Sequence, residues 1–199
     1  MGWFLKKRIL AHHLILSSYG FWLPNDPRGS GSEDLREGKF EDLGEIHHGR
    51  KRLQPTRAEL RAFYVKAFPK LEHAPIWFDD GMRDAIAGAF REVIERNGYT
   101  VWACAIGSNH AHLCVRYHRD RYENIWMNLV SQARVAVLAR SMVGSEHPVW
   151  AHRPYSVFCC STEDIGRTIA YIEGNPGKEG LSGQIWPFVR AYDGWPVLK

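Results

Sequence analysis

Apolar positions along the chain follow two periods, one typical of strands and one typical of helices. Residues 9–23 are rich in β-branched and aromatic side chains, which predicts a first strand. Residues 99–106 and 110–117 predict two more strands, and the short Gly-Ser-Asn run between them predicts a hairpin. Residues 154–160 predict a last strand, so the pattern indicates a sheet of about four strands.

Helices are predicted where apolar residues recur at every third or fourth position. Thr56 follows a proline, and Glu59 stands three residues later, which is the spacing of a capping box. A second helix is predicted over 80–96, with Asp79 or Asp80 as its cap and Asn97-Gly98 as its left-handed end. The remaining helices are expected at about 122–141 and from Ser161 to about Gly174, with Asp164 in the capping-box position.

The order of these elements is strand, inserted helix, helix, hairpin, helix, strand and helix. It predicts an α+β fold in which an antiparallel sheet carries helices packed on one face, in a split β-α-β arrangement of the ferredoxin-like or RRM-like type. Residues 24–77 begin with turn-forming residues and stay polar, charged and Gly-rich to about residue 55. We therefore expect a single domain over 1–199, with an insertion at about 24–77 that is ordered only in part up to about residue 55 and then forms a helix.

Composition narrows the class of protein. Hydrophobic residues make up 45% and aromatic residues 13%, enough for a packed core, and the formal charge of +4 permits a polyanionic partner. The four cysteines lie in apolar stretches without a C-x-x-C pair, which predicts reduced core thiols. No apolar run reaches about 18 residues and no cleavage site follows the basic start, so we expect no membrane span and a cytoplasmic protein.

Two histidines are the first candidates for chemistry. His110 and His112 are two apart on a predicted strand, so their imidazoles project from the same face of the sheet. Paired imidazoles can bind a divalent metal ion together. The alternative is a pair of histidines on a solvated face or hydrogen-bonded in a core, which an isolated H-x-H pattern would favour.

Tyr171 is the second candidate. It lies four residues from Arg167 and from Asn175, so the three form one stripe if the last turn is helical. A guanidinium and an amide on either side of a phenol suit a nucleophile that works near a phosphate. The alternative is an amphipathic tyrosine at the surface.

Together, these two elements resemble the single-tyrosine HUH transposases. The resemblance rests on the H-x-H strand preceded by Asn109 and on Tyr-Ile-x-x-Asn-Pro-x-x-x-Gly-Leu from Tyr171 to Leu181. The segment from Trp150 to Tyr155 is similar to the Trp-x-x-x-x-Tyr segment of one branch, the REP-associated tyrosine transposases. The resemblance covers 9–23 and about 78–182, with the motifs in the right order.

The resemblance implies a metal-dependent nuclease and strand transferase that acts on single-stranded DNA hairpins. It implies that His110, His112 and Asn175 bind Mg²⁺ or Mn²⁺, and that Tyr171 attacks to leave a 5′-phosphotyrosine and a free 3′-hydroxyl. Activation of the phenol would come from Arg167 or from the metal. This chain departs from the pattern at Ala111, where the family has a bulkier residue, in its longer 24–77 segment, and in using an amide next to a proline as third ligand.

DNA contacts and rival functions complete the expectations. We expect phosphate or base contacts from Arg167, Arg153, Tyr155, Arg50, Lys51 and Arg52. Trp22 or Tyr155 would supply base stacking. Neighbouring pairs such as His12-His13 face opposite sides of a strand and are set aside as chelators. The alternatives are a non-catalytic nucleic-acid-binding module on the same sheet, or a hydrolase that uses water instead of tyrosine. Either a monomer or a homodimer is expected.

Overall fold

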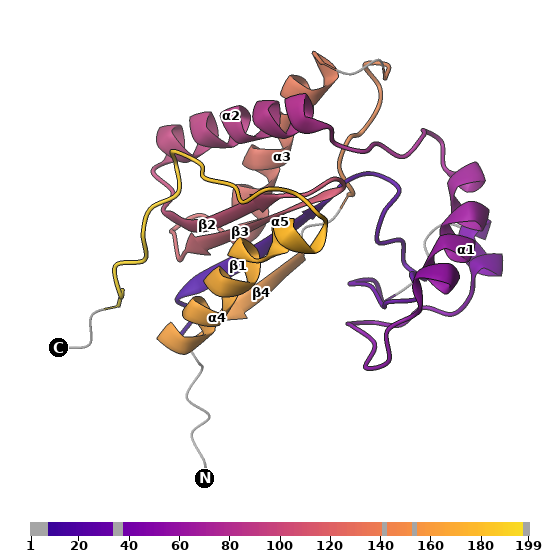
Figure 1. Cartoon of the computed structure of the whole chain (residues 1–199), viewed down its shortest axis with the longest axis horizontal. Helices are drawn as coiled ribbons and strands as arrows, with labels where there is room; N and C mark the ends of the chain where they lie inside the picture. The colour runs from indigo at the N-terminus through magenta and orange to yellow at the C-terminus, as the bar shows by residue number, and fades with distance from the viewer. Residues whose placement is uncertain (1–7, 34–37, 141–142, 153–154, 197–199) are drawn as a thin grey trace, which may run out of the picture. The chain divides into compact units, whose positions relative to one another are not determined.

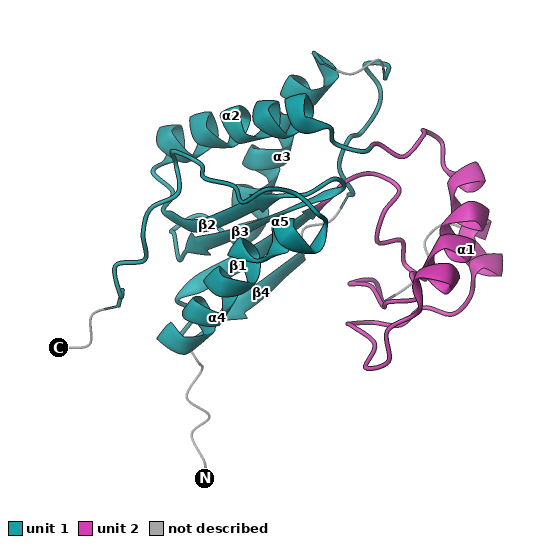
Figure 2. Cartoon of the chain, viewed as in Figure 1, with its two compact units in different colours: residues 1–16, 77–199 teal, residues 17–76 magenta. Residues whose placement is uncertain are grey.

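The computed structural model of this chain describes residues 8–33, 38–140, 143–152 and 155–196. The chain divides into two compact units (Figure 2). Unit 1 contains Met1–Leu16 and Trp77–Lys199, and unit 2 contains Ser17–Ile76. The predicted insertion at 24–77 therefore falls almost entirely within unit 2.

A four-stranded antiparallel sheet forms the centre of unit 1. Its strands are β1 (Ala11–Ser17), β2 (Val101–Ile106), β3 (His110–Arg116) and β4 (Tyr155–Cys159), in the order β2-β3-β1-β4. The hairpin β2-β3 and the pair β1-β4 are both antiparallel. This order places β1 and β3 at the centre, so both bring their side chains into the best covered part of the sheet. The predicted α+β class and antiparallel sheet are confirmed.

Helices lie on both faces of this sheet (Figure 1). His12 of β1 packs against Tyr122, the first residue of α3 (Tyr122–Leu138), with 5.7 Å between ring centroids. The neighbouring residue Ala11 instead packs in a cluster with Ile165 and Ile172 of α4 (Thr162–Glu173). Neighbours on a strand face opposite sides, so α3 and α4 cover opposite faces. The expectation of helices on one face holds for α3 and its partner α2 (Asp80–Asn97), whereas α4 adds a layer on the other face.

Short polar residues begin these helices as the sequence predicts. The Asp79 side chain accepts a hydrogen bond from the Met82 N–H and caps α2, which ends at Gly98 with φ 70°. Ser161 and Asp164 form a capping box that starts α4. A short helix, α5 (Asn175–Lys178), follows α4 directly. Gly174 is at once the C-cap of α4 and the residue that precedes α5, so the two helices are joined without a loop.

The four cysteines are free thiols. Cys104, Cys114 and Cys159 are buried, and Cys160 is partly buried. Cys114 and Cys159 belong to the apolar cluster beneath α4, and burial raises the pKa of Cys114 to about 12. The prediction of core thiols is confirmed for Cys104, Cys114 and Cys159, whereas Cys160 lies at the edge of the core.

Unit 2 has its own hydrophobic cluster. It contains η1 (Gly38–Leu43), α1 (Arg57–Ala67) and η2 (Phe68–Lys70), and the buried residues of its cluster are Phe21, Leu23, Phe40, Phe63, Tyr64 and Ala67. The predicted capping box of Thr56 and Glu59 is present at the start of α1. The first strand is shorter than the predicted 9–23, because Phe21 and Leu23 pack into this cluster instead of continuing β1.

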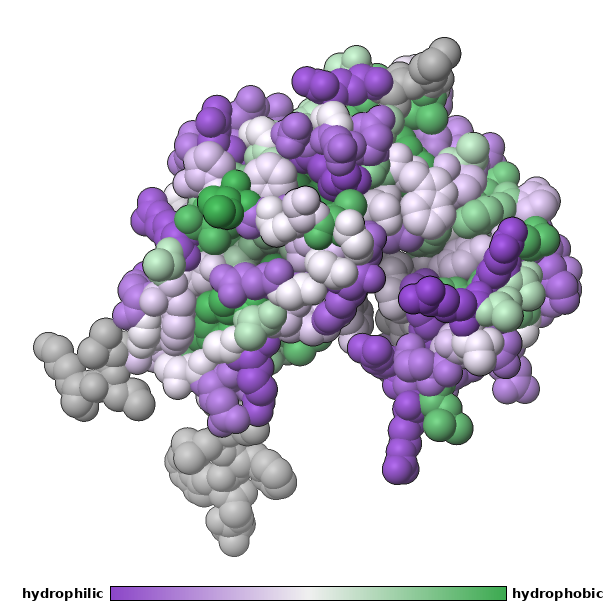
Figure 3. Space-filling view, in the orientation of Figure 1, coloured by the Kyte–Doolittle hydropathy of each residue, from purple (hydrophilic) through white to green (hydrophobic). Residues whose placement is uncertain are grey.

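The surface on the face that Figure 3 shows is mostly hydrophilic, with apolar side chains in small separate patches. None of the helices in the described part of the chain is long and apolar enough to cross a membrane.

Candidate active site

The two predicted histidines lie side by side on β3. Their rings are 4.7 Å apart between centroids and nearly perpendicular. His112 is buried at 4% exposure, and His110, at the start of the strand, is partly exposed. The predicted sharing of one face by the two imidazoles is confirmed, and the structure shows that this is the face that α4 covers.

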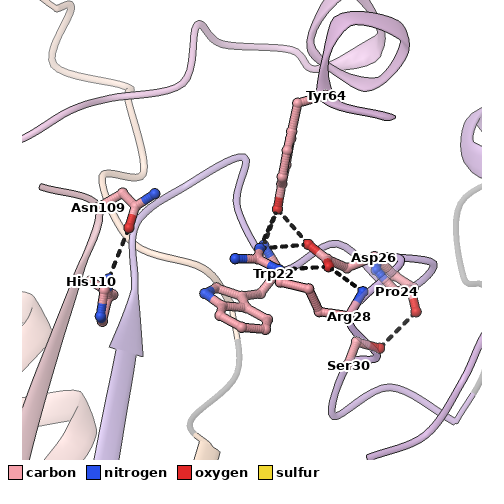
Figure 4. A network of polar contacts seen from close by, with 8 residues as sticks. All are labelled: Trp22, Pro24, Asp26, Arg28, Ser30, Tyr64, Asn109 and His110. Atoms are coloured by element: carbon pink, nitrogen blue, oxygen red, sulfur yellow. Dashed lines mark hydrogen bonds and ion pairs between the residues drawn. The ribbon is translucent and has the colours of Figure 1, made fainter. Parts of the chain in front are cut away.

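Each of these imidazoles has its Nδ1 engaged by a neighbour. The Nδ1 of His110 lies 2.8 Å from Oδ1 of Asn109 (Figure 4) and 3.5 Å from Oε1 of Glu179. The Nδ1 of His112 lies 3.0 Å from Nε2 of His13, which comes from the adjacent strand β1. Neighbours that hold one ring nitrogen fix the orientation of the ring and direct the other nitrogen, Nε2, to a ligand.

His13 was missed by the sequence analysis. The pair His12-His13 was set aside because its members face opposite sides, and they do: His12 packs under α3, while His13 shares the face of His112. The error was to consider only neighbours in sequence, since the partner of His13 lies on the next strand. Alternation along β1 together with a central pairing of β1 and β3 was the signal that would have found it.

Tyr171 reaches the same cluster from the last turn of α4. Its ring makes edge contacts with His112 and His13, at 5.6 and 5.7 Å between centroids. The side chain is 40% exposed, and its hydroxyl has no hydrogen-bond partner among the described residues. The Nζ of Lys178 lies 4.1 Å from the ring centroid, and this cation was also missed.

Burial keeps the inner histidines neutral. Desolvation lowers the pKa of His13 to about 4. Desolvation also lowers the pKa of His112 well below its ordinary value, and the charges of His110, His13 and Lys178 act in the same direction. Only a neutral imidazole has a lone pair to offer, so these pKa values suit a ligand more than a cation.

The segment after α4 is fastened to the β2-β3 hairpin. Oε2 of Glu179 accepts hydrogen bonds from the backbone N–H and the hydroxyl of Ser108, at 2.9 and 2.8 Å. Gln184 pairs with both backbone groups of Ile106, at 2.8 and 2.7 Å. These contacts join the segment that follows the tyrosine helix to the end of β2 and to the turn that precedes His110.

Three other predicted site residues also lie in unit 1. Asn175 is buried at the first position of α5. Arg167, expected to flank Tyr171, forms ion pairs with Glu163 and Asp164 in the first turn of α4, at 2.7 and 2.6 Å. Tyr155 is exposed at the start of β4.

The remaining residues predicted to contact DNA lie in unit 2 or outside the described residues. Arg153 lies outside the described residues. Arg50, Lys51 and Arg52 belong to unit 2. No three or more His, Cys, Asp or Glu side chains, among those that the structure describes, are grouped to hold a metal ion.

Comparisons with known proteins add a likeness of fold. No protein-family model matches this sequence, and no curated protein matches it. One solved structure with a similar fold is described as a REP-associated tyrosine transposase bound to a REP hairpin. The similarity has a TM-score of 0.47 at 13% sequence identity, and it covers 90% of this chain and 74% of the other. At this level of similarity, the side chains of this chain must carry any functional conclusion.

Proposed function

We propose that this chain cleaves and rejoins single-stranded DNA through Tyr171 at a divalent metal ion. The observation that carries the proposal is the position of Tyr171: a half-exposed phenol in contact with His112, on a helix that is followed by a segment hydrogen-bonded to the turn before His110. A tyrosine that served packing alone would bury its ring and satisfy its hydroxyl.

The donor set fits a divalent ion if oxygen ligands complete it. Nε2 of His110 and of His112 would be the nitrogen ligands, with Asn175 as the amide oxygen. Mg²⁺ and Mn²⁺ both favour oxygen ligands, so phosphate oxygens of the DNA would fill the positions beside the two imidazoles and the amide oxygen. An ion held there would polarise a phosphate oxygen and stabilise the charge that develops on it.

The residues of this chain would act on the scissile phosphate as follows. The Tyr171 oxygen attacks phosphorus and loses its proton, the P–O3′ bond breaks, and the leaving oxygen takes up a proton as a 3′-hydroxyl. The product is a phosphotyrosine on the 5′ side, and attack by a 3′-hydroxyl reverses the step. Lys178 would favour the phenolate and the phosphate by its charge. Arg167 has carboxylate partners already and is the weaker candidate for this role.

The test is a search for the covalent adduct. Wild type is incubated with a labelled single-stranded hairpin DNA and Mn²⁺, and the products are separated by denaturing electrophoresis. We expect an adduct that survives boiling and detergent, and none with Tyr171→Phe or in EDTA. His110→Ala and His112→Ala should also form none, with thermal melting to confirm that both variants remain folded.

Tyr155→Phe is the matched control, because Tyr155 is a second half-exposed tyrosine of unit 1. It should form the adduct as wild type does. An adduct with Tyr171→Phe but not with Tyr155→Phe would assign the nucleophile to Tyr155 and overturn the proposal. Cleavage without any adduct would identify water as the attacking group, and binding without cleavage would identify a non-catalytic module.

A further inference from the structure

Trp22 in unit 2 is held at the surface in a conformation that costs energy. Its φ is 55°, in the left-handed region that bulky residues rarely adopt, and its side chain is 38% exposed. The Tyr64 hydroxyl accepts a hydrogen bond from the Trp22 N–H at 3.1 Å and fixes this backbone. Strained residues persist where the surrounding structure imposes them, and they cluster at functional sites.

Arg28 lies against the Trp22 ring. Its guanidinium carbon is 3.6 Å from the ring centroid (Figure 4). Two hydrogen bonds, at 2.9 and 2.7 Å, hold the guanidinium on the carboxylate of Asp26, which is 0% exposed. Tyr64 donates to the same carboxylate at 2.5 Å and accepts from Arg28 at 2.9 Å. We call Trp22 and Arg28 the stacking platform, since buried groups hold both rigidly.

A second loop is fastened beside the platform. Lys51 donates its N–H to the Arg28 carbonyl at 2.9 Å, and a β-bridge joins Ser30 to His48. The two loops approach so closely that a Cβ on Gly29 would lie 1.9 Å from the Gly49 carbonyl oxygen. Gly29 also has φ 91°, so glycine is required there on both counts.

This second loop carries the basic cluster, Arg50, Lys51 and Arg52. Arg50 and Arg52 are exposed and Lys51 is partly exposed. None of the three forms an ion pair with an acidic side chain in the described part of the chain, whereas the charge of Arg28 is matched by Asp26. The cluster therefore offers charge to a partner, and the platform offers an aromatic face.

We propose that the stacking platform and the basic cluster form a binding site for single-stranded DNA, in which a base stacks on Trp22 and neighbouring phosphates pair with Arg50, Lys51 and Arg52. An aromatic face combined with exposed cations suits a single-stranded nucleic acid, because every base has a π-face and every linkage has a charge. The choice of DNA rests on the proposed function, but the site acts by binding and needs neither Tyr171 nor a metal.

The test measures binding in the absence of cleavage. Full-length Tyr171→Phe protein is titrated in EDTA with two fluorescent probes, a short single-stranded oligothymidylate and an abasic strand of the same length. Trp22→Ala should weaken binding of oligothymidylate by roughly 5- to 150-fold, the loss of one stacked base, and leave abasic binding unchanged. Trp22→Phe retains an aromatic face and should bind nearly as tightly as the parent. Trp77→Ala is the matched control, since Trp77 is 53% exposed.

Changing Arg50, Lys51 and Arg52 together to Gln should weaken binding of both probes and make the slope of log affinity against log salt shallower by about 2, at ~0.7 per contact. Equal losses with the two probes on Trp22→Ala, or no loss at all, would overturn the stacking role. An unchanged salt slope would overturn the role of the cluster. If wild type forms the Tyr171 adduct but binds no oligothymidylate here, only this site is wrong; if it binds without ever forming an adduct, only the proposed function is wrong.

Discussion

Tyr64 of unit 2 and Tyr171 of unit 1 both lie among polar side chains, and the two residues differ in the hydrogen bonds that their hydroxyls form. Tyr64 of unit 2 is 9% exposed, and its hydroxyl bonds to Asp26, Arg28 and the Trp22 N–H. Tyr171 of unit 1 is 40% exposed and is held by ring contacts alone, with its hydroxyl unpartnered among the described residues. The hydroxyl of Tyr64 is therefore engaged in hydrogen bonds that hold unit 2 together, whereas the hydroxyl of Tyr171 is available to a ligand.

The charges around the two tyrosines differ as well. Around Tyr64 an aspartate and an arginine are both charged and bonded to each other, and burial, with the nearby Asp26 charge, raises the pKa of Tyr64 further from neutrality. Around Tyr171 the partners are imidazoles that burial keeps neutral. The network of unit 2 therefore stabilises a conformation, whereas the cluster of unit 1 has lone pairs available for a ligand.

The largest expected effect on stability concerns the unit 2 network. Arg28→Met removes the charge partner of the buried Asp26 carboxylate, and we expect a loss of about 3–5 kcal/mol in the free energy of unfolding. Tyr64→Phe should cost about 1–3 kcal/mol, because it leaves the Trp22 N–H without its acceptor and removes one of the hydrogen bonds that the Asp26 carboxylate accepts. Tyr171→Phe should lie within about 0.5 kcal/mol of wild type.

Urea unfolding, monitored by circular dichroism, measures the stability of all three variants. The two tyrosine variants should also differ in activity, because Tyr64→Phe still forms the DNA adduct and Tyr171→Phe does not. The comparison breaks if Tyr171→Phe is the less stable of the two tyrosine variants.

A smaller effect is expected from acid, and it should act through the histidine cluster. The pKa of His13 is about 4 in the folded chain against 6.5 as its ordinary value. The unfolded chain therefore binds the proton first, so stability is complete above pH 6.5 and falls as the pH drops towards 4. The shift corresponds to about 3 kcal/mol.

His13→Gln should remove this part of the pH dependence when unfolding is measured in EDTA between pH 7 and pH 4. His48→Gln is the control, because His48 is an exposed histidine of unit 2. A pH profile of His13→Gln that matches the profile of wild type would contradict the neutral, buried state of His13.

Local signals were sufficient for much of the fold. Thr56 with Glu59, Ser161 with Asp164, and Asp79 all cap helices where the sequence predicts, because a cap depends only on residues three apart. The end of β1 was predicted wrongly, since the apolar residues after Ser17 look like more strand. Whether they join the sheet or a second cluster depends on contacts distant in sequence.

The candidate site was predicted as far as periodicity reaches. His110 and His112 share a face because they are two apart, and Tyr171 was found from its own helix. His13, Lys178 and Glu179 were missed because each acts across a tertiary contact: strand to strand, helix to helix, and helix to hairpin. Helical spacing predicted that Arg167 flanks Tyr171 and contacts DNA. Its guanidinium instead forms ion pairs with Glu163 and Asp164, four and three residues earlier, in the first turn of α4.

The smallest expected effect concerns the contact between the turn before the histidine strand, at Gly107, and the segment after the tyrosine helix, at Glu179. A Cβ on Gly107 would lie 2.6 Å from Oε1 of Glu179, and the three nearest atoms it would meet all belong to that carboxylate. Gly107 does not have a left-handed φ, so alanine is compatible with its backbone and the substitution acts mainly on Glu179. We expect Gly107→Ala to displace the carboxylate from Ser108 and from His110, with a loss of about 1 kcal/mol or less in stability. The rate of adduct formation should fall several-fold, because a shift of the supporting contacts moves Tyr171 relative to His110 and His112.

Glu179→Ala in the Gly107→Ala background should lower the rate no further, since the contact is already lost, whereas additive losses would show that the two residues act separately. Gly183→Ala is the matched control, as a Cβ there meets open space. An adduct rate unchanged by both Gly107→Ala and Glu179→Ala would mean that the fastening is structural only, and Tyr171 would then be positioned by α4 and its ring contacts alone.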